Sequence, residues 1–485
     1  MSETPPETVE ARKVKGFRDI LPHQVLARRR MISTFRAVFE RYGFVPLDTP
    51  AVEYLDALLG LGEEGTKKLF RMQSPEGDEI ALRYDLTVPL ARFVSESPEL
   101  PRPLRRYQVA PVWRADKPDP GRYREFIQFD IDTVGASSPH ADAEILAAMD
   151  EALRELGVSY RIRFSSRKIL DSLMRWAGVP AGKAAGTLRI LDKLDKQGLD
   201  AVCLELGPGR TDASGDRIPG LGLGAEPVEA ITRFLDLPRE IQPSPVVAVP
   251  RGALLDSVEK LFSGVEGAAE GIGELRLMDG WLAASGIDES RVEVDLSIAR
   301  GLDYYTGPVF EAILTEAPEL GAIFGGGRYD GLVERFLGVK VPATGASIGV
   351  DRLLAGMERL GLVAGEGWST ASVLVTVMDR ERMADYIALT KELREDGIAA
   401  EIYLGDAKSL KKQFAYADRV GIPVVVIAGS NEFAAGTVSI KDLTEGKKRE
   451  GEAATREEWV GKRFGQQTVP RAGMAKVVRS LLERP

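Results

Sequence analysis

The chain has 485 residues, too many for one hydrophobic core, so we expect two or three domains. Its apolar and charged fractions are ordinary for a soluble globular protein, and no apolar run approaches the length of a membrane span. The single cysteine excludes an internal disulfide and a thiolate zinc site, and the polar N-terminus lacks an apolar signal core, so we expect a cytoplasmic protein. Both histidines, His23 and His140, are interpreted as surface residues, which disfavours a histidine-ligated metal or a Ser-His-Asp triad. The net charge of −9 argues against general affinity for nucleic acid but leaves room for a local basic face.

The N-terminal region predicts a tail, a helix and an edge strand. Residues 1–14 are polar and are expected to be disordered. In His23–Tyr42 the apolar residues fall on one helical stripe, and Gly43 suits the position after a helix. The next strand, Phe44–Pro50, contains two prolines, which are confined to sheet edges and bulges. We therefore expect this strand at a sheet edge or an interface.

Two predicted strands carry charged residues on one face. In Ile80–Val88 and again in Phe126–Val134, polar residues alternate with apolar ones. A third strand, Tyr107–Arg114, is joined to the second through the loop Ala115–Gly121. Each strand alone could be a solvated sheet face, whereas together they could floor a polar cleft. The polar faces carry Arg83, Asp85, Thr87, Gln128, Asp130 and Asp132.

The middle of the chain predicts helices. Residues 141–157 and 167–177 have amphipathic helical patterns, and the region 167–289 is rich in glycine, alanine and leucine. We interpret that region as a mostly helical insertion into the main domain. Its segment Gly220–Ala225 is similar to a dinucleotide fingerprint but follows no strand, so it is interpreted as a flexible loop.

A strand predicted at 292–298 leads into a glycine-bracketed corner that carries Arg300 and two adjacent tyrosines, Tyr304 and Tyr305. A guanidinium and two phenols can bind an anion beside a planar polar ring, although a plain hairpin with core tyrosines fits equally well. Farther on, the small residues of Ala343–Gly349 lead into a helix with Arg352 in its first turn. Small residues admit a flat ligand, and a helix N-terminus favours anions.

Beyond a linker at 363–370 the pattern changes to alternating strands and helices with one continuous apolar strand, Pro423–Ala428. This pattern predicts a compact α/β domain whose sheet is covered on both sides.

Together these motifs resemble those of the histidyl-tRNA synthetase family, class II aminoacyl-tRNA synthetases, over nearly the whole chain. Motif 1 corresponds to the first helix and the strand through Pro50, motif 2 to Arg114 with Gly121–Phe126, and motif 3 to Gly345–Arg352. The family's histidine-specific signatures correspond to residues 300–307 and 325–330.

The resemblance implies an α+β fold: a class II, mostly antiparallel sheet of six or seven strands with a helical insertion, then an α/β anticodon-binding domain. The expected domains are a tail at 1–14, a catalytic core at 15–166 and 290–362, an insertion at 167–289, a linker at 363–370 and an anticodon-binding domain at 371–485.

The activity implied is that of a histidine–tRNA ligase. Such an enzyme joins L-histidine and ATP into histidyl-adenylate and pyrophosphate, then moves histidine to the 3′ end of tRNA-His. Asp85 and Asp132 would hold the α-ammonium, because a cation relieves the repulsion between two carboxylates. Tyr305 and Tyr329 would recognise the imidazole. The implied histidine-binding set is Asp85, Leu86, Thr87, Gln128, Asp132, Tyr304, Tyr305 and Tyr329.

For ATP, the resemblance implies that Arg114 and Arg300 act on the α-phosphate as catalytic charge acceptors. Phe126 would stack on adenine, and Arg122 and Arg352 would hold the outer phosphates. Mg²⁺ is expected with ATP, with Asp116 as a candidate ligand, and no organic prosthetic group is expected.

The remaining partners are tRNA and a second copy of the chain. Candidate tRNA contacts are Lys408, Lys411 and Lys412, together with Arg102, Arg105 and Arg106 near motif 2, although each cluster alone fits a solvated face. The proline-bearing motif 1 strand predicts a twofold homodimer. In motif 2, Asp119 stands where many bacterial members carry an amide, which suggests that the extra 5′ guanine of tRNA-His is not read in the usual way.

Two alternatives share this fold: the non-catalytic regulatory subunit of ATP phosphoribosyltransferase, and a module that senses uncharged tRNA. The first typically lacks the terminal domain and degrades the catalytic motifs. The presence of Arg114, Arg300, Arg352 and both aspartates favours the enzyme.

Overall fold

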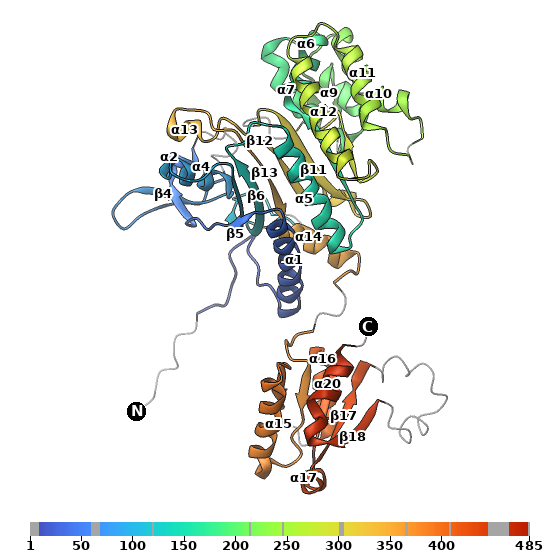
Figure 1. The fold of residues 1–485 in the computed structure, drawn as a ribbon. Coiled ribbons are helices and arrows are strands. Elements are labelled where there is room, and N and C mark those ends of the chain that lie inside the picture. Colours follow the sequence, from blue (N-terminus) through green and yellow to red (C-terminus); the bar gives the residue numbers. More distant parts are fainter. Residues whose placement is uncertain are drawn as a thin grey trace. The chain divides into compact units, whose positions relative to one another are not determined.

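The chain folds into two compact units in a computed structural model (Figure 1). The first unit comprises Met1–Asp19 and Arg28–Leu362, and the second comprises Ile20–Ala27 and Val363–Pro485. The structure describes residues 9–59, 68–118, 121–212, 215–244, 247–299, 305–363, 367–406, 409–444 and 465–483.

The first unit is built on an eight-stranded sheet in the order β1-β5-β6-β13-β12-β11-β7-β10. All neighbouring strands are antiparallel except the outer pairs β1–β5 and β7–β10. The antiparallel class was therefore predicted correctly, and the expected count of six or seven strands was wrong for the described residues. The strands are β1 (Val45–Pro46), β5 (Leu104–Trp113), β6 (Glu125–Val134), β7 (Tyr160–Ser166), β10 (Val292–Val294), β11 (Pro308–Leu314), β12 (Phe324–Arg328) and β13 (Ala343–Gly349).

Apolar helix faces cover this sheet. The predicted stripe of the first helix, α1 (Pro22–Arg41), is buried at Met31, Phe35 and Val38, and the rings of Phe35 and Phe39 pack against Phe129 of β6. The short β1 lies at the sheet edge, as its prolines predicted. The other helices of the first unit outside the insertion are α2 (Leu55–Leu58), α4 (Thr87–Glu96), α5 (His140–Leu156), α13 (Glu334–Leu337) and α14 (Val350–Arg359), with the short 3-10 helix η1 (Pro318–Leu320).

The strand predicted at Ile80–Val88 is wrong beyond Leu82. Only β4 (Glu79–Leu82) is a strand, in a small sheet between β2 (Val52–Tyr54) and β3 (Arg71–Gln73), and α4 begins at Thr87. The Asp85 carboxylate accepts hydrogen bonds from the amides of Thr87 and Val88, at 3.2 and 3.0 Å, and so satisfies the start of the helix. Period-two alternation over so few residues did not distinguish a strand from a strand followed by a helix start.

The predicted insertion is mostly helical, as expected, and belongs to the first unit. The segment Gly220–Gly224 is a loop, as predicted, but it lies between β9 and α10, so the prediction that it follows no strand is wrong. The exact boundaries of the insertion, like those of the other domains, remain a prediction. Its elements are α6 (Arg167–Trp176), α7 (Ala181–Leu191), α8 (Leu194–Gln197), α9 (Leu199–Leu206), β8 (Gly209–Thr211), β9 (Arg217–Pro219), α10 (Ala225–Ile241), α11 (Arg251–Leu261) and α12 (Ala268–Ala284).

The second unit is the predicted α/β domain. Its sheet has the order β15-β14-β16-β17-β18, parallel through β16 and antiparallel afterwards, and the side chains of β14 and β16 are buried on both faces. The sequence did not predict β18 or α17. The elements are β14 (Val373–Val375), η2 (Arg380–Arg382), α15 (Met383–Glu395), β15 (Ala400–Ile402), α16 (Leu410–Val420), β16 (Val424–Ile427), α17 (Ser430–Ala435), β17 (Thr437–Asp442), β18 (Gln466–Pro470), η3 (Arg471–Gly473) and α20 (Met474–Leu482).

Among the described residues, no helix is both long enough and apolar enough to cross a membrane.

Candidate active site

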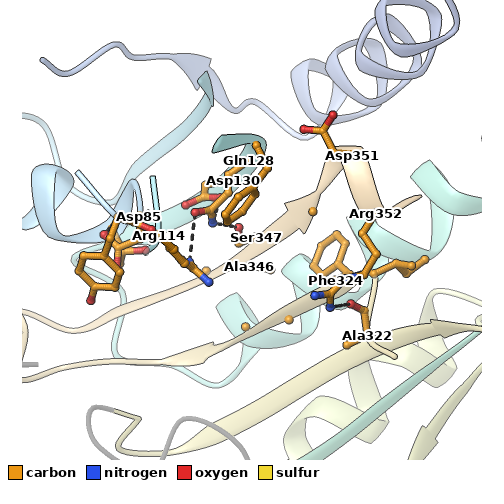
Figure 2. Close-up of a pocket in the computed structure, with 18 of the residues that line it drawn as sticks. Asp85, Arg114, Gln128, Asp130, Ala322, Phe324, Ala346, Ser347, Asp351 and Arg352 are labelled. Carbon is orange, nitrogen blue, oxygen red and sulfur yellow. Dashed lines mark hydrogen bonds between the residues drawn. The ribbon is translucent and has the colours of Figure 1, made fainter. Parts of the chain in front are cut away.

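A pocket of about 450 Å³ opens over the middle strands of the eight-stranded sheet. Figure 2 shows Asp85, Arg114, Gln128 and Asp130 gathered on one side of it, and Arg352 beside Phe324 on another. The predicted residues that line this pocket are Asp85, Thr87, Arg114, Asp116, Arg122, Phe126, Gln128, Asp132, Tyr305, Tyr329 and Arg352.

Three predicted residues in the described part of the chain do not line it. Leu86 is completely buried in a small apolar cluster and does not face the pocket. Lys411 and Lys412 are exposed at the start of α16 in the second unit. Arg300 and Tyr304 lie outside the described residues.

One half of the pocket is a buried acidic floor. Because side chains alternate along β6, Gln128, Asp130 and Asp132 all face the pocket while Phe129 and Ile131 enter the core. Burial raises the pKa of Asp85, and the Val88 amide and Arg114 counteract this effect. Three carboxylates thus converge on one polar space, where a cation would relieve their repulsion.

Asp132 is held by two neighbours. Arg106 of β5 lies directly opposite it in the hairpin register, is fully buried, and places Nη2 2.8 Å from its carboxylate. The Tyr329 hydroxyl donates to the other carboxylate oxygen. Burial still raises the pKa of Asp132, against the opposing effects of Arg106 and Tyr329. A Cβ on Gly345 of β13 would lie 2.0 Å from Asp132, so this glycine leaves room for the carboxylate.

Asp130 is a third buried carboxylate, to which the sequence assigned no role. It faces Gln128, whose Nε2 lies 3.4 Å from Oδ1. Burial raises the pKa of Asp130 to about 7, with Arg106 opposing that shift and Asp132 adding to it. A group with such a pKa changes charge near neutral pH.

The other half of the pocket carries Arg352, and Arg114 lies beside the acidic floor (Figure 2). Arg114 donates from Nε to the Tyr84 carbonyl at 2.9 Å and from Nη2 to Gln128 at 3.3 Å, and its guanidinium lies 5.2 Å from the Phe126 ring centroid. Arg352 donates to the Ala322 carbonyl at 2.7 Å (Figure 2). The oxygens of Tyr84, Gln128 and Ala322 that accept these bonds are neutral, so these hydrogen bonds do not cancel the charge of either guanidinium.

Arg122 and Asp116 form a pair on the rim. Arg122 Nη2 lies 2.9 Å from Asp116, and Lys68 approaches the same carboxylate at 3.5 Å. Partial burial raises the pKa of Asp116, but these two cations outweigh it and leave the pKa below its usual value. No group of three potential ligands among the described residues could hold a metal, so the described pocket does not offer a protein cage for one.

Two basic residues that the sequence considered for tRNA have other partners. Arg106 is completely buried beneath Asp132, so its prediction as a tRNA contact is wrong. Arg105 pairs with Glu144 at 2.9 Å. Lys408 and Asp119 lie outside the described residues.

The main residues that sequence reasoning missed are Arg106, Asp130, Tyr84 and Asp351, of which all but Arg106 line the pocket. Arg106 immediately precedes the strand predicted at Tyr107–Arg114, but only the observed register sets it opposite Asp132. For Asp130, the alternation of β6 predicted the face on which the side chain lies, but it did not predict which residue the carboxylate contacts.

A family model described as histidyl-tRNA synthetase matches residues 16–353, and one described as an anticodon binding domain matches residues 371–463. The chain is 44% identical over 495 residues to a histidine–tRNA ligase of Paracoccus denitrificans (strain Pd 1222), with 98% of each chain covered. It is 42% identical over 489 residues to the histidine–tRNA ligase of Caulobacter vibrioides, covering 98% of this chain and 97% of that one. The crystal structure of histidyl-tRNA synthetase from Nostoc sp. PCC 7120 superposes with a TM-score of 0.80 at 29% identity, covering 98% of this chain and 100% of that one.

Proposed function

The chain belongs to the histidyl-tRNA synthetase family, and from that premise we propose that it is a histidine–tRNA ligase. It joins L-histidine and ATP into histidyl-adenylate with release of pyrophosphate, and then transfers histidine to the 3′ end of tRNA-His. The observation that supports this most directly is the pocket, which has buried carboxylates in one half and arginines in the other. A zwitterionic amino acid and a polyphosphate need those opposite charges in one cavity.

In this proposal the acidic half binds histidine. Asp85 accepts the α-ammonium, with Thr87 and Gln128 as hydrogen-bonding neighbours. Asp132 contributes charge while Arg106 and Tyr329 hold it in place. Tyr305, Tyr329 and Tyr304 are assigned to the imidazole. A pocket that pairs buried polar atoms rejects side chains that lack them by roughly 10⁴–10⁵-fold.

The arginine half binds ATP. Arg114 is assigned to the α-phosphate, Phe126 to adenine, and Arg352 and Arg122 to the outer phosphates. The histidine carboxylate attacks the α-phosphorus and pyrophosphate leaves, so catalysis depends on positioning and on neutralising the charge that develops. Arg300 is assigned to the other side of the α-phosphate as an electrophilic clamp.

In the second step a terminal ribose hydroxyl of tRNA attacks the carbonyl of the adenylate. The ester forms, AMP leaves, and the adenylate phosphate takes the proton of the hydroxyl. The family generally uses a divalent metal with ATP. Because Asp116 is already paired with two cations, Mg²⁺ would be held chiefly by phosphate oxygens, whose charge it would neutralise.

Two surfaces support the proposed macromolecular partners. Exposed apolar residues on edge strands of the first unit, Val45, Val52, Tyr54 and Met72, favour a homodimer. The exposed Lys411 and Lys412 begin a helix in the unit that matches the anticodon binding domain, which favours tRNA contact there.

The proposal is tested by amino-acid-dependent exchange of pyrophosphate into ATP, measured with each of the twenty amino acids. Only histidine should support exchange, and Arg300→Ala should nearly abolish it. Exchange with another amino acid would overturn the specificity. Absence of exchange in the unmodified protein would favour the regulatory-subunit alternative.

The extra 5′ guanine of tRNA-His gives a separate test of the motif 2 loop. We propose that this chain charges tRNA-His transcripts with and without that guanine at similar rates, because Asp119 replaces an amide. A large loss of charging without the guanine would contradict this.

A further inference from the structure

A short N-terminal segment, residues 14–18, is called the strap. It lies against the hairpin of β5 and β6 that carries motif 2, which we call the motif 2 hairpin. The Gly16 carbonyl accepts the Arg124 amide at 2.9 Å, and the Lys15 carbonyl accepts from the Arg124 side chain at 3.2 Å. The Phe17 ring packs edge-on against Phe70, with 5.9 Å between centroids. The strap is therefore fixed by backbone and ring contacts.

Gly16 shows how closely the strap and the hairpin approach each other. Its φ is +89°, in the left-handed region. A Cβ at this position would lie 2.7 Å from the Arg124 Cδ. A side chain at this position would strain the backbone and would have to displace the Arg124 side chain.

Arg18, the last residue of the strap, contacts two residues that line the pocket. Its Nη1 donates to the Tyr123 hydroxyl at 3.0 Å, and its guanidinium carbon lies 3.8 Å from the centroid of that ring. Its Nη2 pairs with Asp351 Oδ1 at 3.0 Å. One planar guanidinium thus holds two separate segments at a fixed spacing.

Asp351 extends this connection into the sheet. Its second oxygen accepts the Ile127 amide of β6 at 2.6 Å, and its side chain is only 5% exposed. Asp351 immediately precedes Arg352, and Tyr123 immediately follows Arg122. The two anchor points of Arg18 are therefore the chain neighbours of the two arginines assigned to the outer phosphates.

We propose that Arg18 is a positioning residue for the nucleotide half of the pocket, acting through Tyr123 and Asp351. It fixes the motif 2 hairpin relative to the start of α14 before ATP binds, so less ordering is needed on binding. This inference rests on the proposed function, because it takes that half of the pocket to be the ATP site.

Loss of the Arg18 side chain should loosen the site without unfolding the protein. Arg28 lies 3.5 Å from the same Asp351 oxygen, so the carboxylate keeps a cationic neighbour. The Ile127 amide also remains as a donor. The expected defect is therefore in nucleotide binding and not in the fold.

The test compares Arg18→Ala and Arg18→Lys with Lys13→Ala in the full-length protein. Lys13 precedes the strap and pairs with Asp19 in solvent, where both side chains are more than half exposed, so it is a matched control. Binding of ATP and of histidine is measured separately by calorimetry, KM values are taken from exchange, and folding is followed in urea.

Arg18→Ala should weaken ATP binding about tenfold, equivalent to roughly 1.4 kcal/mol, and should leave histidine binding within twofold. The ATP affinity of Arg18→Lys should lie between those of Arg18→Ala and the unmodified protein, because one ammonium does not hold both partners in a fixed geometry. Lys13→Ala should behave as the unmodified protein does.

Unchanged ATP binding in Arg18→Ala, an equal loss for ATP and histidine, or full recovery in Arg18→Lys would each overturn the positioning role. Calorimetry measures ATP binding without requiring catalysis, so the test of Arg18 does not depend on whether the protein activates histidine. If the unmodified protein binds ATP but shows no histidine-dependent exchange, the proposed function is overturned. The comparison of ATP binding between the unmodified protein and Arg18→Ala still tests the positioning role.

Discussion

The two halves of the pocket are built differently. In the acidic half, Asp132 is held by a fully buried arginine and a buried tyrosine before any substrate arrives. In the nucleotide half, Arg352 is bound to a carbonyl, and Arg122 lies on the rim with about half of its side chain exposed. The acidic half is therefore part of the core, whereas the nucleotide half includes a partly exposed cation on the rim.

This difference has a physical reason. Buried carboxylates are costly unless paired, so they must be compensated in the free protein, and that compensation ties them to its stability. Partly exposed arginines remain hydrated without a ligand and need only be held in position. We therefore expect substitutions in the acidic half to affect both folding and histidine binding. Those in the nucleotide half should affect mainly ATP binding.

The largest effect is expected from Arg106→Met. This change keeps much of the volume but leaves Asp132 without its buried cation, next to Asp130 and Asp85. Removing one partner of a buried ion pair typically costs about 3–5 kcal/mol, so the free energy of unfolding in urea at pH 7 should fall by that much. The loss should be smaller at pH 5, because protonation removes the uncompensated charge.

Arg105→Met is the control for this prediction. Arg105 neighbours Arg106 on β5 but pairs with Glu144 while its own side chain is 38% exposed. Loss of the Arg105 side chain should lower the free energy of unfolding by less than about 1 kcal/mol. Equal costs for the two variants would show that the acidic half is not part of the core.

The second prediction concerns Asp85→Asn. The amide oxygen still accepts from Thr87 and Val88, so α4 should begin as before while the negative charge is lost. The KM for histidine should rise about 100-fold, equivalent to roughly 2.7 kcal/mol, with ATP binding unchanged. Asp116→Asn, the counterpart on the nucleotide side, should leave the KM for histidine unaffected. The opposite pattern in exchange kinetics would reverse our assignment of the halves.

Much of this site could be predicted from sequence, because strand alternation fixes which side chains share a face. The pattern of β6 placed Gln128 and Asp132 together correctly. It could not show that Asp132 is already paired, since Arg106 lies on another strand and the pairing depends on the register of the hairpin. Register is a tertiary property, and one residue of slip would have turned Arg106 to the other face.

The fold shows a similar limit. The long periodic helix α1 was predicted correctly, and so was β16, a short strand of continuous apolar residues. The region of Asp85 was not, because the alternation over residues 80–88 fits a strand, while the Asp85 carboxylate accepts amides at the start of a helix. The role of Arg18 could not be read from its neighbours either, since both of its partners are more than 100 residues away in the chain.

The third prediction uses the pKa of Asp130, which burial raises to about 7. Between its usual value near 4 and pH 7, the folded protein keeps a proton that the unfolded chain releases, so this group lowers stability as pH rises. Relative to Asp130→Asn, which stays neutral, the unmodified protein should lose roughly 2 kcal/mol between pH 5 and pH 8. Urea unfolding at both values measures this difference. Parallel pH profiles for the two proteins would show that Asp130 ionises normally.

The smallest effect is expected from Arg122→Ala. Its partner Asp116 also contacts Lys68, and the pair lies on the rim, so the free energy of unfolding should change by less than about 1 kcal/mol. The KM for ATP should nevertheless rise about fivefold, because one cation assigned to the outer phosphates is gone. Added salt should reduce the difference between the variant and the unmodified protein, since exposed charges are screened.

This last result is the sharpest test of the contrast between the halves, because it requires a binding defect without a folding defect. If Arg122→Ala destabilised the protein as much as Arg106→Met, the rim arginine would belong to the same compensated core as Asp132. A fivefold change in the KM for ATP, with folding and the KM for histidine unchanged, would mean that the nucleotide cations are separable from the core. That separation is what allows Arg18 to act on ATP binding alone.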